Sequence, residues 1–565
     1  MITVTYKNIG LAALLAISMV SCKKEFLERP PEDQIVDANY YKTSEQILAG
    51  TSGLYNIVWF AYNDKASHGI GDARGGVLAS GSYQLENISM NTTAVTGENA
   101  SSWRSFFNVV GQANAAANNI AKYAGDAVPT NIKNQGIAEA RFMRGLAYSY
   151  LVQNWGPVPI ITDNVALLQD TSIARNTEES VWEFIIRDLR FAANNLPTTN
   201  VKGRLTKYAA QGMLSRMFLT RAGVGQSGTR KQADLDSAKF YAKEVIDKSG
   251  GTLMSSYEDL FMLKNNNNAE SLFALQWTYN GDWGSQNSSQ AYLAFGSSIT
   301  GFADGWGGDL GGSVDQMKLY DPNYVEGSNV INISATGDKR RKATFMFPGD
   351  HYSYIHQQVD DPNNPGKTLI QELDVPLNTT GGLKYNTRAW VKKYVVGRPQ
   401  DNDGKVGQQR TENSTYMMRL AEVYLIYAEA ILGNNQSTTD AEALKYFNAI
   451  RTRAGVPSKS SITWDDIYKE RRLEFGMEGM AWYDMVRLYY FNPSKAFAML
   501  NAQARRPNYR IVPNAEKNPT SWMITSTGES TYQVGESNFR LPIPAGESTK
   551  APNLSKPAVP YSFDK

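Results

Sequence analysis

Apolar residues recur at helical spacing near both ends of the chain. The clearest pattern is one apolar stripe that begins after Thr177 and stops before Pro197, made of Val181, Phe184, Ile185, Leu189, Ala192 and Leu196. Steps of three, four and seven residues place these side chains on one face of an amphipathic helix. Similar patterns predict helices over 44–58, 102–123, 132–155, 206–221, 235–248, 416–431, 441–454 and 464–488.

The helical period fails between about residue 250 and residue 412. Only two short stretches there have strand-like character, 272–277 and 389–394, which are too few for a large sheet. Loops this long in a compact protein are usually functional or disordered. The density of Trp and Tyr in the segment argues against disorder. We therefore interpret 251–412 as an ordered, loop-rich segment for ligand binding.

Short connections between the predicted helices favour antiparallel pairs. Small residues such as Ala138, Gly145 and Ala428 stand where two helices would have to approach closely. The helix pairs resemble tetratricopeptide packing, although the full repeat signature is absent. The predicted fold is mostly α: a tetratricopeptide-like helix-pair scaffold with long irregular loops and a few short strands. Its parts are a leader (1–21), an N-terminal helical part (22–250), the loop-rich segment (251–412) and a C-terminal helical part (413–565).

The first 21 residues have the features of an export signal. Lys7 precedes an apolar run over 9–20, which is too short to span a bilayer, and charged residues follow at 23–25. Cys22 comes directly after this run and is the only cysteine. The segment 19–22 resembles the cleavage motif of bacterial lipoproteins, in which the cysteine becomes the acylated first residue. The alternatives are an ordinary buried thiol and an incidental cysteine after a plain secretory signal.

Charge and composition narrow the class of ligand. The formal net charge of the 565 residues is +2, so no basic surface argues for nucleic acid. Aromatic residues are abundant, with 31 Tyr, 21 Phe and 11 Trp. Most will be buried, but Tyr and Trp also serve recognition surfaces, since their rings are both apolar and polar.

Several motifs occur in an order that resembles one known family. They are Asn154-Trp-Gly-Pro-Val-Pro159 after the segment 138–148, then 416–430, 447–455, Glu470-Arg-Arg-Leu-Glu-Phe475 and Leu541-Pro-Ile-Pro544. Together they are similar to the SusD/RagB family of Bacteroidetes outer-membrane lipoproteins, from Cys22 almost to Lys565. Members of that family carry an acidic export signal directly after the cysteine. Here that signal is weak, because Lys23, Lys24 and Glu25 follow Cys22 and only one of them is acidic.

The resemblance implies a function and a partner. Family members bind oligosaccharide without chemistry and pass it to a SusC-like TonB-dependent transporter, on which they sit as a lid. The RagB branch handles peptides, so a peptide-binding lid is an alternative, and an exported glycan hydrolase is a less favoured one. The resemblance also implies a lipid anchor at Cys22, in the outer membrane and facing outward. No enzyme activity, cofactor or metal is implied.

The candidate ligand-binding residues combine flat aromatic surface with polar groups. A pyranose offers an apolar C–H face and hydroxyls, so its receptor needs both kinds of side chain. The loop-rich segment supplies Trp277, Tyr279, Asp282, Trp283, Asn287, Tyr292 and Trp306, and an earlier region supplies Asp72, Arg74 and Tyr83. Each aromatic residue could instead fill a loop core. Trp103 and Trp182 lie on helical stripes, which predicts structural roles.

Catalytic and metal patterns receive little support from the residues. His68, His351 and His356 lack the spacing of a zinc helix, and no G-x-S-x-G motif occurs. Two carboxylates suffice for a glycosidase, so that alternative stays open. The charged run 470–474 has helical spacing, which favours a structural ion-pair network.

The predicted acylation can be tested by replacing Cys22 with Ala. Without the thiol no lipid can be attached, so the variant should be released from the outer-membrane fraction while its glycan binding in vitro stays unchanged. Fractionation followed by immunoblotting measures the release. A variant that still sediments with the outer membrane would show that acylation is not what holds the protein there.

Overall fold

The computed structural model describes residues 37–168, 172–280, 282–376, 389–505, 509–513, 521–526 and 532–563. The predicted leader and Cys22 lie outside the described residues. Within these ranges, no helix is both long enough and apolar enough to cross a membrane.

Helices make up most of the regular structure, which confirms the predicted fold class. The longer ones are α4 (Ser44–Ser52), α6 (Gly97–Tyr123), α7 (Thr130–Trp155), α8 (Glu178–Asn195), α9 (Lys207–Arg221), α10 (Gln232–Lys248), α15 (Leu420–Leu432), α16 (Ala441–Ala454), α17 (Trp464–Phe475), α18 (Ala481–Tyr489) and α19 (Pro493–Asn501). Short helices are α3 (Asp37–Tyr40), α5 (Leu85–Ile88), α11 (Ser289–Leu293), α12 (Ser297–Thr300), α13 (Val314–Lys318), α14 (Arg340–Thr344), α20 (Glu536–Phe539) and α21 (Ala545–Lys550).

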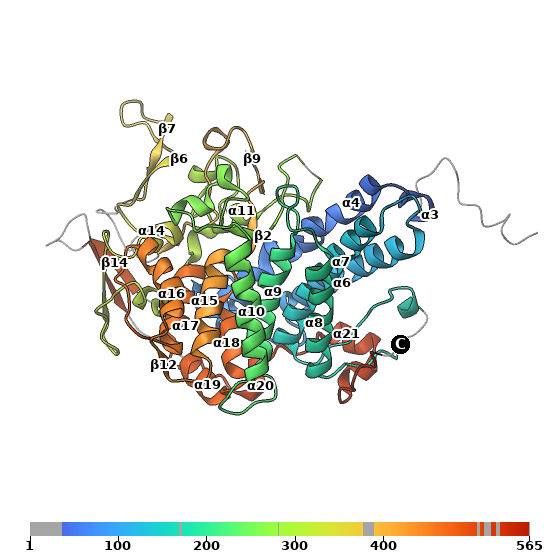
Figure 1. The fold of residues 1–565 in the computed structure, drawn as a ribbon. Helices are drawn as coiled ribbons and strands as arrows, with labels where there is room; N and C mark the ends of the chain where they lie inside the picture. Colours follow the sequence, from blue (N-terminus) through green and yellow to red (C-terminus); the bar gives the residue numbers. More distant parts are fainter. Residues whose placement is uncertain are drawn as a thin grey trace, which may run out of the picture.

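The long helices form one continuous array. Each packs against the next along the chain from α6 to α10, and α10 then packs against α15, which packs against α16. Figure 1 shows α8, α9, α10, α15 and α16 side by side across the molecule. The array therefore bridges the gap of about 170 residues between α10 and α15, and the intervening loop-rich segment is placed beside it rather than within it.

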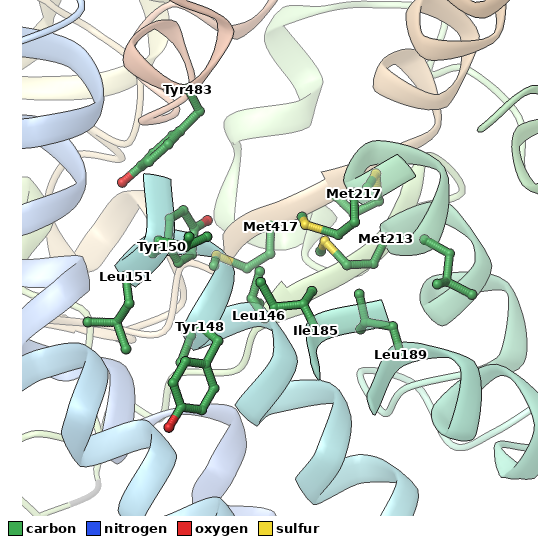
Figure 2. Packing of buried hydrophobic residues seen from close by; sticks show 14 of the residues in the cluster. Leu146, Tyr148, Tyr150, Leu151, Ile185, Leu189, Met213, Met217, Met417 and Tyr483 are labelled. Carbon is green, nitrogen blue, oxygen red and sulfur yellow. The ribbon is translucent and has the colours of Figure 1, made fainter. Parts of the chain in front are cut away.

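One large apolar core runs through this array. Leu146 of α7, Ile185 of α8 and Met213 of α9 converge there with Met417, as Figure 2 shows, and all four are buried. Gly145 lies where α7 crosses α8, and a Cβ there would lie 3.4 Å from side-chain atoms of Asp188 and Leu189. The predicted role of Gly145 at a helix crossing is therefore confirmed.

The strands are short and lie in sheets of two or three. Described strands are β1 (Leu78–Ser80), β2 (Ser271–Leu275), β3 (Leu310–Gly312), β4 (Val330–Ser334), β5 (Phe345–Met346), β6 (His351–Asp360), β7 (Thr368–Asp374), β8 (Trp390–Val391), β9 (Val406–Gly407), β10 (Arg410–Thr411), β11 (Thr415–Arg419), β12 (Ser437–Thr438), β13 (Ile462–Thr463), β14 (Tyr509–Pro513) and β15 (Ser521–Ser526). All their pairings are antiparallel, including β2 with β11, β6 with β7, and β14–β15–β4. The β6–β7 hairpin projects from the upper left of the molecule in Figure 1.

Three predicted helix boundaries need correction. The helix predicted over 44–58 ends at Ser52 and continues as two 3₁₀ turns, Gly53–Tyr55 and Ile57–Trp59. The segment 415–419 is strand β11, so the next helix begins at Leu420 and not at Tyr416. The helix predicted over 464–488 is two helices, because the chain leaves helical geometry at Gly476 and has a φ of +71° at Gly479.

Arg419, at the junction of β11 and α15, joins the array to the loop-rich segment. Its guanidinium is buried and reaches Glu270 at 2.6 Å, Glu474 at 3.0 Å and Glu478 at 2.7 Å. Arg453 also pairs with Glu270 and Glu474. The charged run 470–474 is therefore structural, as predicted.

The buried carboxylate of Glu474 is stabilised as an anion. Burial alone would raise its pKa, but Arg453, Arg419 and Arg340 outweigh burial and lower the pKa to about 2. A carboxyl group whose folded-state pKa is depressed contributes stability above its unfolded pKa near 4.3 and loses that contribution as the pH falls toward 2. The network therefore favours the folded state at neutral pH.

Replacing Arg419 with Met should destabilise the protein strongly. The change leaves three buried carboxylates short of a cation, and breaking a buried pair in this way costs about 3–5 kcal/mol. Urea denaturation measures the free energy of unfolding. The matched control is Arg187→Met, because Arg187 pairs with Glu183 on the surface and such pairs contribute about 0–1 kcal/mol. Equal losses in the two variants would contradict this account.

Candidate ligand-binding site

A π-helix forms the base of the candidate site. It covers Tyr62–Ala73 (η3), and helices of this type are rare and often lie at functional sites. Two glycines allow the surrounding chain to approach it. A Cβ on Gly71 would lie 2.3 Å from the backbone oxygen of Gly479, and one on Gly69 would lie 2.3 Å from the Gln84 amide oxygen.

Two tryptophans are exposed beside this helix. Trp283 is 65% exposed and Trp306 is 49% exposed, although Trp is usually highly buried. Each ring is supported edge-on by a second aromatic ring. Phe60 lies 5.6 Å from Trp283, and Tyr292 of α11 lies 5.2 Å from Trp306, measured between ring centroids. We call these four residues the aromatic platform.

Polar groups surround the Tyr292 side of the platform. Lys65 of the π-helix places its ammonium 5.8 Å from the Tyr292 ring centroid. Ser288 donates a hydrogen bond of 2.6 Å to the neighbouring Asp64. Burial raises the pKa of Tyr292, and the negative charge of Asp64 raises it further. Burial likewise raises the pKa of Tyr83, a hydrogen bond with Gln84 lowers it in part, and the charges of Asp64 and Tyr292 add smaller increases.

A cavity of about 170 Å³ adjoins these residues. It is lined by Lys65, Gln84, Asn87, Glu98, Ser101 and Ser102, among others. Lys65 belongs to both the cavity wall and the platform surroundings. The rings of Tyr292 and Trp306 thus lie near a cation, and the adjoining cavity adds a carboxylate and hydroxyls, which suits a ligand that has apolar faces and many hydroxyl groups.

Trp277 and Asn287 lie inside the protein. Trp277 is 5% exposed within the main core, and its indole N–H donates to Thr415 at 3.0 Å. Asn287 accepts a hydrogen bond from Asn63 at 3.0 Å and donates to the Asn413 carbonyl at 2.6 Å. Thr415 donates to Asn63 in turn. These two predicted ligand contacts are therefore supports that tie the π-helix to the loop-rich segment.

Asp72 and Arg74 are also structural. Asp72 is fully buried, accepts the Gly479 N–H at 3.1 Å and lies 3.2 Å from His68 Nδ1. Arg74 donates to the carbonyls of Asn538 and Phe539 and lies over the Trp482 ring. The sequence predicted that Asp72, Arg74, Trp277 and Asn287 contact the ligand. The structure buries all four side chains inside the protein, where they make structural contacts instead.

The remaining predicted residues keep access to solvent. Asp282 is exposed next to Trp283, and Tyr83 is half-buried. Tyr279 is half-buried against Gly407, where a Cβ would come within 3.1 Å of its ring. Phe60 and Lys65 were not predicted. Phe60 follows the 3₁₀ turn Ile57–Trp59, and Lys65 lies in the π-helix. No regular hydrophobic period in the sequence predicts either element, and the contacts of these residues with Trp283 and Tyr292 come from tertiary packing.

Carboxylate and histidine groups elsewhere do not assemble a metal site in the described residues. His351 pairs with Glu372 and Asp374, and His356 pairs with Asp401.

Comparison with known proteins gives consistent matches over nearly the whole chain. A sequence profile described as the SusD family matches residues 242–561, and one described as "Starch-binding associating with outer membrane" matches residues 25–219. A SusD-like protein of Bacteroides ovatus is 37% identical, with 98% of each chain covered. A SusD-like protein of Formosa agariphila, P25, is 23% identical, covering 85% of this chain and 89% of its own.

A solved structure matches the fold closely. It was determined with a xylogluco-oligosaccharide, is 36% identical, covers 92% of this chain and 100% of its own, and has a TM-score of 0.79.

The packing of the π-helix can be tested with two glycine variants. Gly71→Ala should destabilise the protein by about 1–3 kcal/mol, because the new methyl group meets backbone atoms of Gly479. Gly69→Ala should cost less, since the neighbouring Gln84 side chain can move. Thermal unfolding of both variants measures the difference. A Gly71→Ala protein as stable as the wild type would show that the contact with Gly479 is not tight.

Proposed function

The chain belongs to the SusD family, and on this basis we propose that it binds oligosaccharide on the aromatic platform without performing chemistry. The observation that carries the proposal is the pair of exposed tryptophans, each supported by a second ring. Exposed Trp rings are costly to leave in water, and a pyranose that covers them removes their apolar surface from solvent.

The polar groups around the platform orient the sugar in the proposed site. Asp282, Tyr83 and Tyr292 offer hydrogen-bonding groups for sugar hydroxyls, and Lys65 adds a cation beside Tyr292. Tyr279 belongs to the proposal as a flanking residue because it stays partly exposed. The four buried residues discussed above act only as supports.

The proposal extends to the cellular role. We infer that the protein is anchored to the outer membrane through Cys22, faces outward, and delivers its ligand to a SusC-like TonB-dependent transporter. The profile described as "Starch-binding associating with outer membrane" supports the location, and family membership supports the partner.

A xylogluco-oligosaccharide is the first ligand to test. The structure determined with one is 36% identical and covers 92% of this chain. Starch oligosaccharides are the second choice, since the profile over residues 25–219 carries that description.

The decisive experiment compares Trp283→Ala and Trp306→Ala with the wild type in calorimetric titrations with these oligosaccharides. Burying an aromatic side chain contributes about 1.5–3 kcal/mol, so each variant should weaken binding about ten- to a hundredfold. Phe240→Ala is the matched control, because Phe240 is 58% exposed on α10, outside the platform. Its affinity should equal that of the wild type.

Three results would contradict the proposal. If both tryptophan variants bind like the parent, the platform is not the glycan site. If new reducing ends appear when the protein is incubated with the oligosaccharides, the protein hydrolyses glycan instead of only binding it. Binding of peptides in the absence of any glycan binding would favour a peptide-capturing lid.

A further inference from the structure

A second, larger groove lies between helix α6 and the segment 37–58, which includes α4. Its volume is about 560 Å³, within the range of about 300–1,000 Å³ that is typical of small-ligand sites. Residues within 108–119 of α6 contribute one wall, and residues within 37–58 contribute the other. We call it the α6 groove. It shares no lining residue with the cavity beside Lys65.

Ile57 connects the α6 groove to the aromatic platform. Its side chain lines the groove and is 45% exposed. Gly284 directly follows Trp283, and a Cβ on Gly284 would lie 3.4 Å from the Ile57 side chain and 3.9 Å from the Phe60 ring. The loop that carries Trp283 therefore packs against Ile57, and the groove begins beside the Trp283 end of the platform.

The floor of the α6 groove is apolar. It is formed by the buried residues Leu54, Val58 and Ala116. Two small residues, Gly53 and Ala115, also line the groove and leave room for a ligand. Open apolar surface next to an exposed isoleucine is costly to leave in water, which favours a ligand that has apolar faces.

Amide side chains line the α6 wall of the groove. Asn108, Gln112 and Asn119 follow one another at steps of four and seven residues, so they share one face of the helix, and they span about 16 Å along it. Asn108 donates to the Val58 carbonyl at 3.3 Å, and its side-chain oxygen accepts no hydrogen bond from a described residue. Gln112 is exposed. Among the described residues that line the groove, only Asp37 is charged. A row of neutral donors and acceptors matches the hydroxyls of successive uncharged sugar rings.

We propose that the α6 groove continues the aromatic platform beyond Trp283 and binds further sugar residues of the same oligosaccharide. This inference rests on the proposed function and adds the class of ligand, which is an extended, uncharged glycan chain longer than the platform. The apolar faces of the additional rings lie on Leu54 and Ile57, and their hydroxyls face Asn108 and Gln112. The affinity for glycan therefore increases with chain length until the groove is filled.

The test titrates the purified protein calorimetrically with xylogluco-oligosaccharides of one and of three repeat units. The longer ligand should bind the wild type at least about tenfold more tightly, since only it reaches from the platform into the groove. Ala115→Trp fills the groove, so it should abolish this preference and leave the affinity for the shorter ligand unchanged, which also shows that the variant is folded. Ala233→Trp is the matched control, because Ala233 is exposed on α10 and does not line the groove. It should bind both ligands like the wild type.

Gln112→Ala is a milder second variant. Loss of one hydrogen bond should weaken binding of the longer ligand about two- to tenfold and leave the shorter one unaffected. The proposal is overturned if the wild type binds both ligands equally tightly, or if Ala115→Trp keeps the preference for the longer one. Either result leaves the platform in place as long as Trp283→Ala still weakens both ligands. If Trp283→Ala and Trp306→Ala weaken neither, the proposed glycan site itself is wrong and the groove proposal fails with it.

Discussion

The contact of Arg419 with three buried glutamates fixes the position of the loop-rich segment on the helical array. Removing such charges from water costs several kcal/mol per ion, so the arrangement persists only when every partner is in place. Glu270 precedes β2, whereas Glu474 lies in the last turn of α17 and Glu478 follows that helix, so one guanidinium joins two distant parts of the chain to β11. Arg419 is also the last residue of β11 and stands opposite Ser271, the neighbour of Glu270, in the antiparallel pairing of β11 with β2.

Residues next to that pairing hold the π-helix in place. Thr415 begins β11 and contacts Trp277 after β2, while its hydroxyl bonds Asn63 of the π-helix. Asn287 joins Asn63 to the carbonyl of Asn413. These buried hydrogen bonds tie the π-helix to the loop-rich segment that carries the exposed rings, so Trp277 and Asn287, which were predicted to contact the ligand, support the structure near them.

The sequence predicted the features that depend on local spacing. Helices such as α8 follow from an apolar stripe because residues three and four apart share a face whatever lies around them. The π-helix and the break before α18 depend on the approach of Gly71 to Gly479, which are far apart in the chain, so no window of sequence reports them. Trp277 and Trp283 show the same limit. They are six residues apart and similar in context, yet one is 5% and the other 65% exposed, because only the first is covered by other segments.

Trp283 and Trp306 differ in what would happen to them if related genes exchanged segments by recombination. Trp306 and its supporting Tyr292 lie 14 residues apart in one loop-rich segment, so an exchange of that segment by recombination would transfer the pair intact. Trp283 rests on Phe60, which lies in the N-terminal part of the chain. A transferred segment would therefore carry Trp306 together with the ring that supports it. The orientation of Trp283 would depend on the residue that the recipient protein has at the position of Phe60. In such a fold, the two ring pairs of the platform can change independently, and ligand preference can change with each of them.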